Sequence, residues 1–415
     1  MRGPISNTWN RYSVTKPTKT KHLVVTTPQG PSGDLIKEAR FAFNYSAKQT
    51  EREVSLTMPL RAESYASGAL LPIFEMNRPE GYLLSKIEEA FAKEGGLDDM
   101  RLLGIVGGAQ IGRLTYERPE EARPHVKSRI GLEEILVRQP TSELFDFLVA
   151  TYFESGISGV QPKVLVPNDD KHLAAVGRET VVQADLIVKS GGDEFPHLTQ
   201  NEFMCLTAAR RAGIATANFW LSEDGGLFVT ERFDLRAGVA LGFEDMTVLM
   251  NKGSRRKYEG SYENVAKAVR LFLAEADPLA ALHELFEYIA FIVMVRNGDG
   301  HLKNFGLLYE HPSHMESIRL APLYDVVTTS IYGFTYPRTF ITKYDRTLAL
   351  NLRKSREYPD RESLLAFGRE HCGVHAPERV IDRIAESLSA TLKDQRERIP
   401  SKLWHDLSKE WQVGL

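Results

Sequence analysis

Short runs of alternating or apolar residues mark the first part of the chain. Such runs are typical of strands, and glycine-rich joints between them are typical of turns. We predict three strands and one helix here, followed by a pair of strands joined by a glycine turn: His22–Thr27, Arg40–Tyr45, Val54–Pro59, Gly81–Lys93 and Leu103–Leu114. This pattern indicates an α+β module.

Helices and strands alternate in the middle of the chain. Helices are predicted over Leu132–Phe153 and Leu198–Ala212, where apolar residues recur at helical spacing. Strands are predicted over Lys163–Val166, Asp185–Lys189 and Leu227–Asp234. Asp224-Gly225-Gly226 precedes the last of them and is a typical hairpin turn.

The pattern becomes mainly helical beyond residue 262, with an amphipathic helix predicted over residues 376–398. The whole pattern predicts an α+β protein with four parts. They are a flexible basic tail (1–22), an N-terminal α+β subdomain (23–130), a nucleotide-binding lobe (131–245) and a helical catalytic lobe (246–415).

Composition narrows the class of protein. The chain has 415 residues, of which 42% are hydrophobic and 26% charged, as in soluble globular proteins. A net charge of −3 argues against broad nonspecific binding of nucleic acid. Two cysteines imply no disulfide framework, and no apolar run approaches the ~18 residues of a spanning helix. We therefore expect a cytoplasmic protein without a membrane segment.

The segment Arg296-Asn-Gly-Asp-Gly-His-Leu-Lys-Asn-Phe305 follows an apolar run and carries the clearest chemistry. Asp299 precedes Asn304 by five residues, which is the spacing of a protein-kinase catalytic loop. Asp325 follows at the end of a second apolar stretch. We predict that Asp299 orients a substrate hydroxyl, and that Asn304 and Asp325 bind Mg²⁺. His301 and Lys303 would steady the phosphates.

Three further segments fit the binding of a nucleotide. The small residues of the loop Glu154–Lys163 would let backbone N–H groups approach phosphates, although such a glycine-rich segment is often only a turn. Lys189 ends an apolar strand and can reach phosphates, with Glu202 on the next helix as its partner. Glu231–Asp234 forms the connection after a strand. Its backbone groups could bind adenine, and Asp234 could accept a hydrogen bond from a ribose hydroxyl. For both Lys189 and this connection, the alternative interpretation is an ordinary strand end without a role in binding.

The basic segment Asn251–Tyr258 lies between that connection and the catalytic loop. It could bind an acidic substrate surface or phosphate. A solvated loop is the alternative interpretation.

At these residues the chain resembles the HipA-like serine/threonine kinases of bacterial toxin–antitoxin systems. The matching motifs are Ser158-Gly-Val-Gln-Pro-Lys163, Asn201-Glu202, Glu231-Arg-Phe-Asp234, Gly298-Asp-Gly-His-Leu-Lys-Asn304 and Leu323-Tyr-Asp325. Asn77-Arg-Pro-Glu-Gly81 resembles a segment of the family's N-terminal subdomain. The resemblance implies a two-lobed protein-kinase-like core with a mainly helical C-terminal lobe.

The resemblance also implies roles for individual residues. Asp299 is then the catalytic residue. The expected ATP–Mg²⁺ site consists of Ser158, Gly159, Val160, Gln161, Pro162, Lys163, Lys189, Glu231, Arg232, Phe233, Asp234, His301, Leu302, Lys303, Asn304, Tyr324 and Asp325.

Biological expectations follow from the same family. Its members autophosphorylate a serine of the nucleotide loop, and some phosphorylate aminoacyl-tRNA synthetases and so inhibit translation. Some members carry a serine two positions before the equivalent of Ser158, where this chain has Gly156. Ser158 and Ser155 remain as candidates for the autophosphorylation site, and we favour Ser158. The expected partner is a helix-turn-helix antitoxin, with DNA bound only through it. A small-molecule kinase and a co-repressor acting through such an antitoxin remain alternatives.

Overall fold

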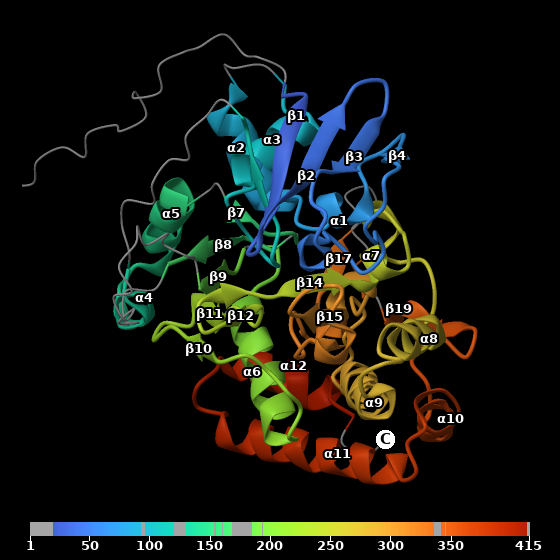
Figure 1. Cartoon of the computed structure of the whole chain (residues 1–415). Coiled ribbons are helices and arrows are strands. Elements are labelled where there is room, and N and C mark those ends of the chain that lie inside the picture. Colours follow the sequence, from blue (N-terminus) through green and yellow to red (C-terminus); the bar gives the residue numbers. More distant parts are fainter. Residues whose placement is uncertain are drawn as a thin grey trace, which may run out of the picture.

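The computed structural model describes residues 20–92, 96–119, 130–152, 155–159, 161–167, 185–192, 194–335, 342–344 and 346–412 (Figure 1). The basic tail lies outside these ranges up to residue 19, as does Val160 of the nucleotide loop. None of the helices in the described ranges has the length and apolar character needed to cross a membrane.

The N-terminal module is an antiparallel sheet packed against helices. Its strand order is β4-β3-β2-β1-β6. Alternate residues of the strands point to one face, and Leu23, Val25, Leu35 and Phe43 there are fully buried. The elements are β1 (His22–Thr27), β2 (Gly30–Lys37), β3 (Phe41–Tyr45), β4 (Tyr65–Ser67), β6 (Thr115–Glu117), α1 (Pro72–Glu75), α2 (Gly81–Ala90) and α3 (Asp99–Val106).

A second antiparallel sheet, of order β10-β11-β9-β8, is covered on both faces. Val164, Val188 and Val229 pack against α5, whereas Phe228 of the opposite face packs against α6. This explains why the strands are apolar at nearly every position. The elements are α4 (Leu132–Val137), α5 (Thr141–Tyr152), β8 (Lys163–Val166), β9 (Leu186–Ser190), α6 (Leu198–Arg211), β10 (Phe219–Leu221) and β11 (Leu227–Glu231).

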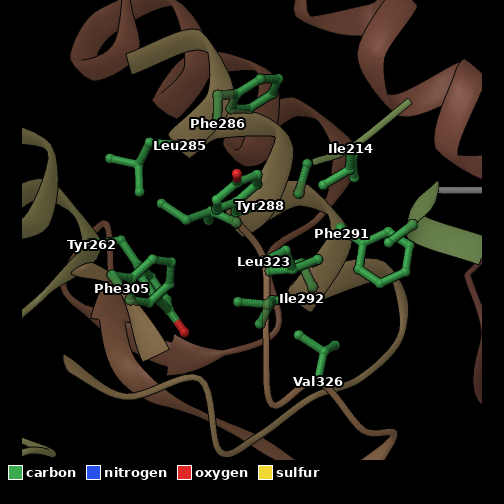
Figure 2. Packing of buried hydrophobic residues seen from close by; sticks show 14 of the residues in the cluster. Ile214, Tyr262, Leu285, Phe286, Tyr288, Phe291, Ile292, Phe305, Leu323 and Val326 are labelled. Atoms are coloured by element: carbon green, nitrogen blue, oxygen red, sulfur yellow. The ribbon is translucent and has the colours of Figure 1, made fainter. Parts of the chain in front are cut away.

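The C-terminal part is mainly helical and surrounds α9, which is buried along most of its length. Figure 2 shows Phe291 and Ile292 of this helix beside Leu323 and Val326. Helix α11 runs along the bottom of Figure 1 and packs against α6 and α9. The helices are α7 (Met246–Leu249), α8 (Tyr262–Phe272), α9 (Pro278–Met294), α10 (Arg361–Cys372), α11 (Pro377–Asp394) and α12 (Ser401–Glu410).

Small sheets join these parts. Strand β14 pairs with β15 and β15 with β16, while β5 and β7 form a short parallel pair between the first module and the nucleotide loop. The bounds are β5 (Ala109–Gln110), β7 (Ser155–Gly156), β12 (Leu235–Arg236), β13 (Val239–Ala240), β14 (Gly242–Asp245), β15 (Gly306–Tyr309), β16 (Arg319–Leu320), β17 (Gly333–Thr335), β18 (Thr342–Tyr344), β19 (Thr347–Leu352) and β20 (Ser355–Glu357).

Two predicted elements were wrong. Leu103–Leu114 does not form a strand pair, because α3 occupies its first part. The Asp98 side chain accepts from the Arg101 N–H at 2.8 Å and starts that helix. Val54–Pro59 is not a strand, because two of its hydrogen-bond donors bond to the side chain of Glu244 instead of to a neighbouring strand. Ser55 Oγ and Leu56 N donate to the Glu244 carboxylate at 2.8 and 2.7 Å.

Candidate active site

The segment that carries Asp299 begins where the buried helix α9 ends. Arg296 has a left-handed backbone with φ of 55°, which turns the chain sharply out of the helix. Asn297 Oδ1 then accepts from the Asp299 N–H at 2.9 Å, and Asn304 Oδ1 accepts from the His301 N–H at 3.0 Å. Gly298 is required, since a Cβ there would lie 2.6 Å from a backbone oxygen. Local hydrogen bonds thus fix the loop.

Asp299 presents its carboxylate at the surface of this loop. The Tyr258 hydroxyl donates to Oδ1 of Asp299 at 2.8 Å. Loss of hydration raises the pKa of Asp299 and the negative charge of Asp325 acts in the same direction, whereas the hydrogen bond from Tyr258 opposes the shift. A raised pKa favours acceptance of a proton.

Four charged side chains form a cluster beside the loop: Lys163, Lys189, Glu202 and Asp325. The register of β8 and β9 places Lys163 opposite Lys189, so the two ammonium groups share one face of the sheet. Lys189 Nζ donates to Glu202 Oε1 at 2.6 Å and also to Asp325, which lies 3.5 Å from Lys163 Nζ. The fourfold cluster thus alternates in sign.

The cluster sets the charge state of Asp325. Burial by itself would raise the pKa of this carboxyl, but the two lysines outweigh it and hold the pKa well below its usual range. Burial lowers the pKa of Lys163, whereas for Lys189 its two carboxylate partners outweigh burial and raise the pKa. Asp325 also has a left-handed backbone with φ of 52°, and its side chain remains 35% exposed. It is an ionised carboxylate with an open side.

The loop predicted to bind the nucleotide (residues 155–163) lies against the loop of Asp299 and against the N-terminal module. Lys303 Nζ donates to Ser158 Oγ and, at 3.0 Å, to the Met76 carbonyl. Ser158 Oγ donates in turn to Glu80 Oε1 at 3.2 Å. At Gly159, where φ is +129°, a Cβ would lie 2.5 Å from Lys163 Nζ, so this glycine lets the loop approach that lysine.

Of the remaining predicted residues, some form hydrogen bonds to neighbouring segments of the site and others are buried beside it. Tyr324 donates its hydroxyl to the Lys303 carbonyl at 2.7 Å, and its ring packs against Phe233. Gln161 and Pro162 bond to Ser190 at the end of β9. Burial lowers the pKa of His301 to about 3, so this ring is neutral. The Leu302 side chain is fully buried in the core and can contribute only backbone.

The connection after β11 differs most from expectation. Arg232 and Asp234 form a buried ion pair with Nη2–Oδ2 at 2.6 Å, and Asp234 also accepts from the Gly112 N–H at 2.6 Å. The Arg232 Nε–H also donates to Oδ1 at 3.0 Å, so both oxygens of Asp234 are occupied and the structure does not present them to a ribose. Glu231 Oε2 accepts from Asn218 at 2.9 Å. We assign Arg232 and Asp234 to the junction with the N-terminal module.

Sequence reasoning missed Glu80 and the contact of Tyr258 with Asp299. Glu80 lies 3.7 Å from Lys303 Nζ and 3.8 Å from Lys257 Nζ, beside Ser158. Its signal was the segment Asn77–Gly81, which carried a resemblance but no assigned role. Tyr258 ends the basic segment Asn251–Tyr258 and could not be placed without the fold.

The donor groups present fit a magnesium nucleotide. No set of three or more His, Cys, Asp and Glu side chains gathers as a metal site among the residues that the structure describes. Asp325 and the amide oxygen of Asn304 are oxygen donors of the kind Mg²⁺ prefers, with water and phosphate completing its shell. The nearby ammonium groups of Lys163, Lys189 and Lys303 suit phosphate oxygens.

Comparisons with known proteins agree with this geometry. Residues 23–117 match the family described as the HipA N-terminal domain, and residues 155–395 match the HipA-like C-terminal domain. The Shewanella oneidensis serine/threonine-protein kinase toxin HipA is 26% identical over 322 residues, covering 70% of this chain and 71% of that protein. The Sinorhizobium fredii protein Y4mE, which has a provisional kinase name, is 25% identical over 369 residues, covering 82% and 83%.

A Haemophilus influenzae relative, also provisionally named a kinase, is 28% identical over 200 residues; these cover 45% of this chain and only 56% of that relative. Among solved structures, a chain of the Shewanella oneidensis HipA, HipB and operator DNA complex superposes with a TM-score of 0.67 at 19% identity. The match covers 94% of this chain and 96% of that one. The predicted α+β, kinase-like fold is thus confirmed.

Proposed function

Because this chain belongs to the HipA-like family, we propose that it is an ATP- and Mg²⁺-dependent serine/threonine protein kinase and the toxin of a toxin–antitoxin system. The observation that carries the proposal is the position of Asp299. Its carboxylate accepts a hydrogen bond from the Tyr258 hydroxyl at 2.8 Å, and Lys303 of the same loop donates to Ser158 of the loop predicted to bind the nucleotide. In this proposal, the place where Asp299 receives the substrate hydroxyl lies next to the lysines that bind phosphate.

Each residue has a role in this proposal. Lys163, Lys189 and Lys303 bind phosphate oxygens, and Glu202 holds Lys189 in place. Asn304 and Asp325 hold the magnesium ion, which neutralises charge on the phosphates when bound. Asp325 is already ionised, since the lysines depress its pKa.

Asp299 orients the acceptor hydroxyl and takes its proton. Its raised pKa makes it a better proton acceptor than an ordinary exposed aspartate. The fixed loop around it supplies the positioning, because the N–H groups of Asp299 and His301 are both held by side chains of the loop.

We propose Ser158 as the site of autophosphorylation. Its hydroxyl lies between Lys303 and Glu80 in the nucleotide loop. A phosphate there would place at least one further negative charge beside Glu80. The Glu80 carboxylate would repel the phosphate, and the loop would be displaced. Phosphorylation would thereby silence the enzyme.

The proposed target is a cytoplasmic protein such as an aminoacyl-tRNA synthetase, whose inactivation would inhibit translation. The proposed partner is a helix-turn-helix antitoxin, by analogy with the solved assembly of HipA, HipB and operator DNA. DNA would be bound only through that partner.

Intact-mass measurement followed by peptide mapping tests the proposal. Wild type and Asp299→Asn are incubated with Mg-ATP, and we expect phosphate on the loop of residues 155–163 in the wild type alone. Phosphate on both proteins would reject Asp299 as the catalytic residue. Transfer to a small molecule but to no protein would favour a metabolite kinase instead.

A further inference from the structure

Tyr258 occupies a distinctive place in the candidate site. Its hydroxyl donates to Asp299 Oδ1 at 2.8 Å, while its side chain is 40% exposed. It belongs to the basic segment Asn251–Tyr258, to which the proposed chemistry assigns no role. A partly exposed tyrosine therefore holds the carboxylate that must meet the substrate.

The backbone on both sides of this side chain is fixed. The Lys257 carbonyl accepts from the Leu302 N–H at 3.1 Å, and the Tyr258 carbonyl accepts from Arg356 Nη2 at 2.7 Å. The ring lies edge-on to the His301 ring at 5.1 Å between centroids. Rotation about the side-chain bonds is enough to withdraw the hydroxyl from Asp299, and no movement of the main chain is needed.

The acceptor of a phosphoryl group must reach the same carboxylate. A hydroxyl activated by a carboxylate lies within about 2.6–3.2 Å of one of its oxygens. The Tyr258 hydroxyl already lies at this distance from Oδ1, so an acceptor hydroxyl that approaches Oδ1 from the same side would collide with it. We propose that Tyr258 stands in for the acceptor hydroxyl at Oδ1 and that a protein acceptor engages this oxygen only after the side chain has turned away. The inference rests on the proposed role of Asp299.

The size of the effect follows from competition between the two hydroxyls. Apparent affinity for the acceptor falls in proportion to the fraction of molecules in which Asp299 is free. Loss of one hydrogen bond to a charged group, partly offset by hydration, is expected to lower the acceptor KM about three- to tenfold. Binding of ATP does not involve this hydroxyl and should not change.

The kinetic test compares the wild type with Tyr258→Phe and with Tyr344→Phe, a matched control at an exposed tyrosine of β18. A synthetic peptide of residues 150–165, which contains Ser155 and Ser158, serves as the acceptor with saturating Mg-ATP. We expect a lower peptide KM in Tyr258→Phe alone, with kcat and the KM for ATP unchanged. A fall in kcat at constant KM would make Tyr258 a positioning residue. An unchanged peptide KM, or phosphate on Tyr258 itself, would also overturn the proposal.

A chemical test separates this contact from kinase activity. Tetranitromethane nitrates accessible phenolates. Partial burial and the bonded Asp299 carboxylate both raise the pKa of Tyr258 and so keep its phenol protonated. Mapped by mass spectrometry, nitration of Tyr258 should be faster in Asp299→Asn than in the wild type, with equal rates at Tyr344. Equal rates at Tyr258 would overturn the gating contact. If nitration of Tyr258 is faster in Asp299→Asn but the wild type phosphorylates neither the peptide nor itself, the kinase proposal is rejected, and the gate with it.

Discussion

The two sides of the candidate site hold their charges in different ways. On the proposed nucleotide side, Lys189 is buried and bonded to two carboxylates, one of which is itself buried. On the proposed acceptor side, Asp299 is exposed and its side chain accepts from Tyr258. If the proposed roles hold, a preorganised phosphate site lies beside an acceptor site that can open easily. Charge removal should therefore cost stability on the first side and activity on the second.

Lys189→Met should have the largest effect on stability. Glu202 would keep its buried carboxylate without the 2.6 Å partner, and an unpaired buried charge costs about 3–5 kcal/mol. Urea unfolding would measure the loss. The double variant Lys189→Met, Glu202→Gln is the control, and it should recover part of the stability because no buried charge is left unpaired. Equal losses in the single and double variants would contradict this account.

Asp299→Asn should lower activity strongly and leave stability almost unchanged. Loss of a positioned proton acceptor is expected to lower the phosphorylation rate by about 10²-fold or more. The unfolding midpoint should stay close to that of the wild type, because the exposed side chain is held by few contacts. Autophosphorylation measured by intact mass, together with thermal unfolding of the same samples, tests both halves. A wild-type rate in the variant would remove the basis of the comparison.

Glu244→Gln extends the comparison to a buried carboxyl group that is held by hydroxyl and N–H groups rather than by lysines. Glu244 accepts from Tyr309 at 2.6 Å and from Ser55 and Leu56 of the N-terminal module, and among the described residues no cationic side chain bonds to it as the two lysines bond to Asp325. Burial raises its pKa to about 7. The native state therefore retains a proton that the unfolded state loses near pH ~4.5.

The sign of the pH dependence follows from this difference. The stabilisation from Glu244 is fully present below the unfolded pKa and is lost as the pH rises through about 7. Relative to the wild type, Glu244→Gln should gain on the order of 1–3 kcal/mol between acidic and mildly alkaline pH. Urea unfolding of both proteins over this range would measure it. Parallel pH profiles would show that folding does not raise the pKa of Glu244.

The sequence predicted elements best where one pattern had one interpretation. Helices α5, α6 and α11 and the hairpin before β11 were confirmed, because apolar periodicity and turn residues agree there. The run Leu103–Leu114 failed because glycines suggested turns while Met100, Leu103 and Val106 form the buried face of a helix.

The site shows a similar division. The spacing of Asp299, Asn304 and Asp325 pointed to one region, since the three follow the ends of two buried apolar segments. The contacts of Glu80 with Ser158 and of Tyr258 with Asp299 join residues that are 78 and 41 positions apart. Such contacts depend on how modules pack, which no local pattern encodes. The burial of Asp234 against Gly112 was unpredictable for the same reason.

Arg256→Ala should have the smallest effect and would show how loosely the acceptor side is held. Arg256 Nε lies 2.7 Å from Glu259 Oε2, but both side chains are more than half exposed, at 57% and 53%. An exposed pair contributes about 0–1 kcal/mol and is weakened further by salt. Urea unfolding at low and high salt should therefore nearly superimpose on that of the wild type. A loss as large as that of Lys189→Met would mean that this pair fixes the segment before Tyr258. The acceptor side would then be as rigid as the nucleotide side.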